Sequence, residues 1–96
     1  MKKYDTLYTK LKSMAHGANT SCRDFTRLLK EFGFEVRDSG KFGHKVVTHA
    51  AIGLQPGDGA NYNCGHNPGT HVKPCYIKRF VSICEDYENE LRGYLK

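Results

Sequence analysis

The strongest structural signal in the chain lies in residues 21–36, which read SCRDFTRLLKEFGFEV. Ser21 and Asp24 form the Ser-x-x-Asp pattern that caps the start of a helix. Apolar side chains then recur at intervals of three and four, as on one face of a helix: Phe25, Leu28, Leu29 and Phe32. Gly33 follows at the position where a left-handed residue ends many helices. The pattern predicts a helix over about residues 22–32.

Three strand patterns come after this helix. Residues 34–37 alternate apolar and charged side chains, and residues 44–49 are rich in β-branched side chains, so both are typical of strands. Residues 61–64 predict a third, weaker strand. The glycine-rich stretches between them, residues 38–43 and 53–59, predict a turn and a loop.

Helical patterns flank the strands on both sides. Residues 4–14 place four apolar side chains on one face: Tyr4, Leu7, Leu11 and Met14. Residues 15–20 read as a linker. Pro74 suits a first helical turn, and the apolar spacing after it predicts a helix over about residues 75–92.

The expected fold class is therefore α+β. After residue 20 the element order is α-β-β-β-α, for which the simplest packing is a three-stranded antiparallel sheet with both long helices on one face. Double-stranded RNA-binding domains share this arrangement, and here an extra N-terminal helix precedes it. A chain of 96 residues is expected to form one domain.

Composition and charge narrow the function classes. Apolar residues make up 39% and charged residues 26% of the chain, which argues against global disorder. No apolar run is long enough for a membrane span, and no secretory signal opens the chain, so we expect a cytoplasmic protein. Residues 1–84 hold thirteen Lys and Arg against six Asp and Glu, a net +7, whereas residues 85–96 hold two against four, a net −2. A body this basic favours a polyanionic partner, nucleic acid above all, although solubility alone would also explain it.

Three stretches of the sequence resemble HicA-type toxins, the messenger-RNA nucleases of toxin–antitoxin systems. The first is residues 21–36, a short helix that ends in a Gly-aromatic step into a strand. The second is residues 40–46, GKFGHKV, which matches the turn that places a histidine at the start of the second strand. The third is residues 73–81, KPCYIKRFV, which matches the closing apolar helix behind a lysine-containing loop. The serine of the family's Gly-Ser-His turn is replaced here by Gly43.

The N-terminal helix, residues 3–14, is similar to an extension found in a longer HicA-like subgroup. With it the resemblance covers residues 1–96 as a single HicA-like domain, in which residues 1–19 are the helical extension and linker. The resemblance implies an endoribonuclease that cleaves messenger RNA without a metal ion or other cofactor. It also implies a monomer when free and a HicB-like antitoxin that covers the histidine.

His44 is the candidate catalytic residue. Metal-free RNA cleavage needs a base for the ribose 2′-OH, an acid for the leaving 5′-oxygen and a cation beside the phosphorane, and histidine titrates near neutrality. Lys41 and Lys45 flank His44 in the sequence. A surface histidine between two solvated lysines is the plain alternative.

A second acid or base could come from three other histidines. His49 lies five residues from His44, so strict alternation places it on the opposite face of the strand. His66 and His71 lie in the last loop and could approach from the third strand, although each also reads as an ordinary loop histidine.

Four residues are the candidate RNA contacts: Lys41, Lys45, Lys73 and Phe42. The lysines would bind phosphates, with Lys73 near the start of the last helix. Phe42 is a candidate for base stacking, and Tyr62 is a second one.

Two cysteines and two histidines in residues 64–75 permit another interpretation. Cys64, His66, His71 and Cys75 carry two thiols and two imidazoles, an acceptable zinc set, and a small zinc-stabilised RNA-binding module without catalysis is the alternative function. The Cys-x-x-Cys pair that usually anchors such sites is absent. We therefore expect no zinc and four reduced thiols, as is typical of cytoplasmic proteins.

Overall fold

The computed structural model describes residues 3–17, 19–40, 43–55, 59–64 and 69–96. It contains these elements in chain order: α1 (Lys3–His16), α2 (Cys22–Glu31), β1 (Glu35–Asp38), β2 (His44–Thr48), the short 3-10 helix η1 (Ala50–Ile52), β3 (Asn61–Asn63), α3 (Pro74–Asp86) and α4 (Glu88–Tyr94). The predicted α+β class is confirmed, and the antiparallel sheet has the strand order β1-β2-β3.

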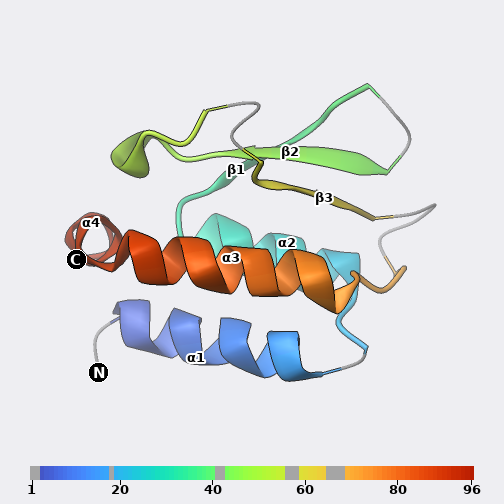
Figure 1. Ribbon diagram of the computed structural model, residues 1–96, viewed down its shortest axis with the longest axis horizontal. Helices are drawn as coiled ribbons and strands as arrows, with labels where there is room; N and C mark the ends of the chain where they lie inside the picture. Colours follow the sequence, from blue (N-terminus) through green and yellow to red (C-terminus); the bar gives the residue numbers. More distant parts are fainter. Residues whose placement is uncertain (1–2, 18, 41–42, 56–58, 65–68) are drawn as a thin grey trace.

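The elements form three layers (Figure 1). The sheet is the first layer, α2 and α3 cover one of its faces, and α1 lies on the far side of these two helices. None of the described helices covers the second face of the sheet.

The register of the strands determines which side chains point toward the helices. Val36 pairs with Val47, and Lys45 pairs with Tyr62. Because Val47 and Tyr62 are buried and paired residues share a face, this set faces the helices. The alternate set, which includes Arg37, His44 and Thr48, therefore lies on the face that the helices leave open.

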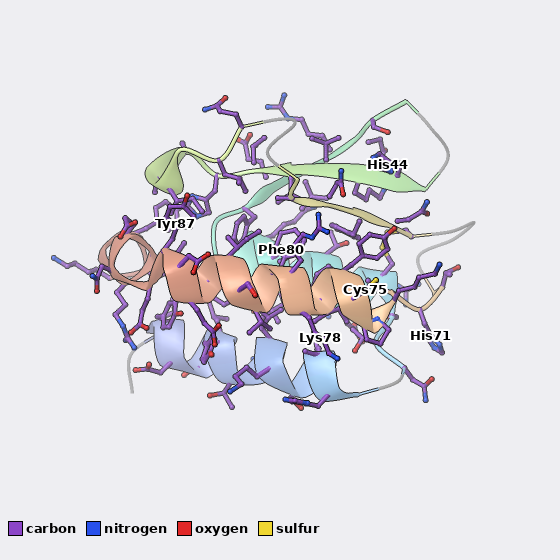
Figure 2. The ribbon with its side chains drawn as sticks, in the orientation of Figure 1. His44, His71, Cys75, Lys78, Phe80 and Tyr87 are labelled. Carbon is purple, nitrogen blue, oxygen red and sulfur yellow. A yellow bond between two sulfur atoms is a disulfide. The ribbon has the colours of Figure 1, made fainter. Side chains whose placement is uncertain are left out.

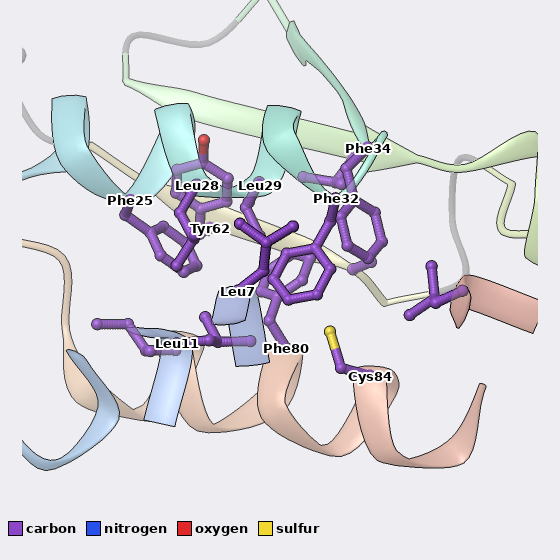
Figure 3. Close-up of a cluster of buried hydrophobic side chains, with 14 of the residues drawn as sticks. Leu7, Leu11, Phe25, Leu28, Leu29, Phe32, Phe34, Tyr62, Phe80 and Cys84 are labelled. Atoms are coloured by element: carbon purple, nitrogen blue, oxygen red, sulfur yellow. The ribbon is translucent and has the colours of Figure 1, made fainter. Parts of the chain in front are cut away.

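Aromatic side chains fill the space between the sheet and the helices (Figure 3). The ring of Phe80 meets the rings of Phe25, Phe34 and Tyr62 edge to face, with centroids 5.5 to 6.1 Å apart. This geometry suits the quadrupoles of the rings and adds to the gain from burial. The layer ties both long helices to β3 and to the segment before β1.

The N-terminal helix contributes to this core rather than extending from it. Tyr4, Leu7 and Leu11 are buried, as predicted, but Ala15 takes the fourth buried place and Met14 is only partly buried. The hydroxyl of Tyr4 donates to the carbonyl oxygen of Cys84 in α3, at 2.8 Å.

The predicted single helix over residues 75–92 is wrong in one respect, because the helix breaks at Tyr87. This residue has φ −114° and ψ 28°, outside the helical range. Figure 1 shows α3 lengthwise and α4 end-on, so the chain turns sharply between them. The turn keeps Leu91 and Leu95 in the core and brings Tyr94 toward β1.

Gly33 ends α2 in the left-handed region, with φ +95°, as its place in the sequence predicts. A Cβ atom on this residue would also lie 2.7 Å from Cζ of Tyr94. Both conditions exclude a side chain, because the backbone would be strained and the aromatic ring would have to move.

Replacing Gly33 with alanine should therefore lower the free energy of unfolding by about 1–3 kcal/mol. Gly93→Ala is the matched control, since a Cβ there would meet nothing within 4 Å and alanine favours a helix. Urea unfolding of the two variants measures the difference. Equal stabilities would contradict the packing of Tyr94 on Gly33.

The expectation of four reduced thiols is wrong. Cys22 at the start of α2 forms a disulfide with Cys64 just after β3, with the two Cα atoms 5.4 Å apart. Spacing along the chain does not reveal this pair, because the fold brings together residues 42 positions apart. Cys75 is a free, exposed thiol, whereas Cys84 is buried, and burial raises the pKa of its thiol to about 12.

Candidate nucleic-acid interface

His44 is the first residue of β2 and is partly exposed (Figure 2). It pairs with Asn63 of β3, and its carbonyl oxygen accepts from the amide of Ser39, at 3.1 Å. Its ring has no hydrogen bond or ion pair in the described part of the chain. The imidazole therefore stands on the open sheet face, available to a ligand.

Gly43 lies at the turn that leads into β2. Its φ is +75°, a left-handed conformation that strains serine but not glycine. Its carbonyl oxygen accepts from the amide of Cys64, at 2.7 Å. The glycine thus lets the chain turn into β2 while keeping its pairing with the end of β3.

His49 is excluded as the second catalytic group. Its side chain is 1% exposed on the helix-facing side, as alternation from His44 predicts. Nδ1 accepts from the amide of Ala51 at 3.2 Å, so Nε2 carries the proton and donates to the carbonyl oxygen of Phe32 at 3.0 Å. Both ring nitrogens are used in holding η1 against α2.

The proposed zinc set does not come together in the described residues. Cys64 is bonded to Cys22, which removes its thiolate, and His66 lies outside the described residues. His71 and Cys75 are exposed at the same end of the molecule as His44. Within the described ranges no three His, Cys, Asp or Glu side chains are arranged to hold a metal ion.

The side chain of Lys45 does not lie beside that of His44, contrary to the sequence prediction. Neighbours in a strand point to opposite faces, and Lys45 forms an ion pair with Asp38 on the helix-facing side. Lys41 and Phe42 lie outside the described residues. Lys73 is exposed at the N-terminus of α3 and makes no side-chain cap.

Tyr62 is not a base-stacking residue. It is fully buried, and its hydroxyl lies 2.5 Å from that of Thr26 in α2. Burial raises the pKa of its phenol to about 12. Its place in the core follows from its pairing with Lys45 on the face that meets the helices.

Arg37 supplies the cation on the face of His44, and the sequence interpretation missed it. It pairs with Val46, two residues along β2 from His44, so the two side chains are diagonal neighbours. The Arg37 side chain is 75% exposed, with one ion pair to Glu35 at 3.2 Å. An exposed pair of this kind contributes little to stability, so the guanidinium can turn to a phosphate.

A basic stripe on α2 was also missed. Its members, spaced four and three residues apart, are exposed and form no ion pair in the described ranges: Arg23, Arg27 and Lys30. The same helical spacing that identified the apolar face of α2 would have identified this stripe.

The charges are separated along the molecule. The N-termini of α2 and α3 lie at the end that carries His44, and Tyr87 lies at the other end (Figure 2). The acidic residues flank Tyr87 at the end of α3 and in α4: Glu85, Asp86, Glu88 and Glu90. Helix N-termini carry partial positive charge, so the His44 end is the more favourable place for a polyanion.

A pocket of about 450 Å³ opens where β1 and β2 meet η1 and α4. Its walls include Glu35, Arg37, Thr48, His49 and Tyr94. Glu35, Arg37 and Thr48 lie on the open sheet face. The pocket therefore opens onto the same face as His44, farther along β2.

No protein-family model, curated protein or solved structure matches the chain. None of the described helices combines the length and the apolar character required to cross a membrane. The function is therefore inferred from the geometry of the site.

Proposed function

We propose that this protein is a HicA-like toxin, a cytoplasmic endoribonuclease that cleaves messenger RNA without a metal ion. His44 acts as the general acid or base. The observation that carries the proposal is the setting of His44. Its imidazole is partly exposed, has no partner among the described residues, and lies on the open face of the sheet at the end of the molecule opposite the acidic residues of α3 and α4.

The fold supports this function by its arrangement. The chain has the order α2-β1-β2-β3-α3 with both helices on one sheet face. The same order also occurs in double-stranded RNA-binding domains, and we propose α1 and α4 as additions to that arrangement. Fold alone does not determine activity, so the site residues carry the argument.

The proposed reaction is attack of a ribose 2′-OH on the adjacent phosphorus. His44 removes the proton from the 2′-OH as the 2′-oxygen bonds to phosphorus, the bond to the 5′-oxygen breaks, and water donates a proton to that oxygen. Arg37 stabilises the negative charge of the phosphorane in place of the predicted Lys45. The products are a 2′,3′-cyclic phosphate and a 5′-hydroxyl.

A HicB-like antitoxin is the proposed protein partner. The sheet face that holds His44 is left uncovered by the helices that the structure describes, so a partner that covers this face would block RNA and silence the enzyme. The free toxin is proposed to be a monomer.

Inducible expression tests the function directly. Wild-type protein should arrest growth and degrade messenger RNA, and the His44→Ala variant should do neither. RNA binding without any cleavage by the purified wild-type protein would instead favour the non-catalytic binding module.

RNA binding should depend strongly on salt, and the basic stripe of α2 should supply part of this dependence. Replacing Arg23, Arg27 and Lys30 with glutamine should reduce the slope of log K against log salt by about 2, since each phosphate contact to a single strand contributes about 0.7.

The matched control removes the same charge from α1, the layer farthest from the sheet, through Lys3→Gln, Lys10→Gln and Lys12→Gln. It should leave the slope nearly unchanged. Fluorescence titrations between low and moderate salt measure both triple variants, and equal slopes would place the RNA path elsewhere.

A further inference from the structure

We infer that the pocket between Tyr94 and the open sheet face binds one unpaired nucleobase of the RNA substrate, with guanine preferred. The inference rests on the proposed function, and it adds to it a subsite for base recognition away from the reacting phosphate.

Tyr94 is an aromatic surface fixed in position. Its side chain is 54% exposed, yet one part of the ring packs on Gly33 and another meets the ring of His49 edge to face, with centroids 4.9 Å apart. A large, exposed ring held in this way loses little freedom when a base stacks on it. Aromatic side chains are the usual platform for unpaired bases.

The other walls of the pocket supply polar groups. Glu35 carries a carboxylate that is 65% exposed, Arg37 a guanidinium and Thr48 a hydroxyl. A carboxylate accepts hydrogen bonds and donates none. It therefore favours guanine, whose N1–H and N2–H groups lie side by side and can both donate to Glu35.

The pocket and His44 lie on one path. Thr48 lies four positions along β2 from His44, a distance of about 13 Å. A short stretch of single-stranded RNA can span this distance. Arg37 lies opposite Val46, midway between them, so the cation proposed to stabilise the reacting phosphate stands between His44 and the pocket. The base in the pocket would therefore determine where the chain is cut.

The charged side of α4 does not interfere with this path. Arg92 binds Glu88 and Asp5 of α1, at 2.7 Å each, so this part of α4 is turned toward α1. Tyr94 is turned toward Gly33 and His49. The acidic residues that flank Tyr87 lie in α3 and α4 rather than on the sheet face.

The test uses RNA that cannot be cut, so that binding is separated from catalysis. Fluorescent 2′-O-methyl oligouridine decamers would carry at one position a guanine, an adenine, a cytosine or no base. The wild-type full chain should bind the guanine probe at least about 5-fold more tightly than the abasic probe, as expected for one stacked base.

Three variants identify the pocket as the source of this preference. Tyr94→Ala should abolish the difference between the guanine and abasic probes, whereas Tyr94→Phe should keep it. Tyr87→Ala is the matched control, because Tyr87 is the other exposed large aromatic side chain among the described residues and lies outside the pocket. Glu35→Gln changes only an exposed side chain, so it should fold normally and lose the preference for guanine over adenine.

Equal binding of the guanine and abasic probes by the wild-type chain would overturn the inference, as would an unchanged preference in both Tyr94→Ala and Glu35→Gln. These outcomes are independent of cleavage. If the protein prefers the guanine probe but cuts no unmodified RNA, the base-binding pocket is supported and the proposed nuclease function is refuted. If it cuts RNA but shows no preference among the probes, the nuclease function is supported and the base-binding pocket is refuted.

Discussion

Replacing His44 with alanine is expected to lower the rate of RNA cleavage by about 10²–10⁴-fold, the range that a general acid or base contributes. No other described histidine combines the same exposure with a place on the open sheet face: His49 is buried, while His16 and His71 lie outside the strands. The loss should appear in single-turnover rates measured with excess chelator, because the proposed route uses no metal.

The fold should survive this change. The His44 ring makes no hydrogen bond in the described part of the chain, so the free energy of unfolding should fall by less than about 1 kcal/mol. His16→Ala is the matched control, an exposed histidine at the end of α1, and it should cut at the wild-type rate. Full activity in His44→Ala would refute the assignment, whereas loss in both variants would point to a shared role in binding.

Reduction of the Cys22–Cys64 disulfide should lower the free energy of unfolding by about 4 kcal/mol, because the cross-link closes a loop of 42 residues and restricts the unfolded chain. This is a large share of the stability of a domain this small. In a compartment that keeps thiols reduced, the protein would have this lower stability.

Denaturant unfolding with and without dithiothreitol measures the change, and thiol labelling counts the bonds. The folded protein without reductant should label once, at Cys75, the unfolded protein twice and the reduced, unfolded protein four times. Cys75→Ser should leave the stability and its response to reductant unchanged. Three or more reactive thiols in the unfolded, unreduced chain would show that the disulfide does not form.

Local patterns predicted most of the elements. The capping pattern at Ser21 and the periodic apolar face after it predicted both ends of α2 to within one residue. The Ser21 side chain does accept a hydrogen bond from the amide of Asp24, at 3.2 Å. The break at Tyr87 and the helix η1 were not predicted. Both depend on tertiary packing. The break lets α4 pack against the core, and η1 is held by the hydrogen bond from His49 to Phe32. The spacing of apolar residues along the chain does not predict such contacts.

The position of His44 in the fold was predicted better than its surroundings. Alternation along the strand already places Lys45 on the face opposite His44, but which face the helices cover follows from pairing and packing. Lys45 and Tyr62 were therefore assigned to RNA although they pair with each other on the helix-facing side. Arg37 was missed for the same reason, since its distance from His44 is set by register rather than by spacing along the chain.

The position of α1 has a consequence for biosynthesis. The hydrogen bond from Tyr4 to Cys84 joins residues 80 positions apart, which a ribosome adding about 5–20 residues per second separates by about 4–16 s. During that interval the apolar face of α1 has no α3 to cover it. The three layers can close only after α3 has been synthesised, so until then α1 lacks the helix against which it packs in the folded protein.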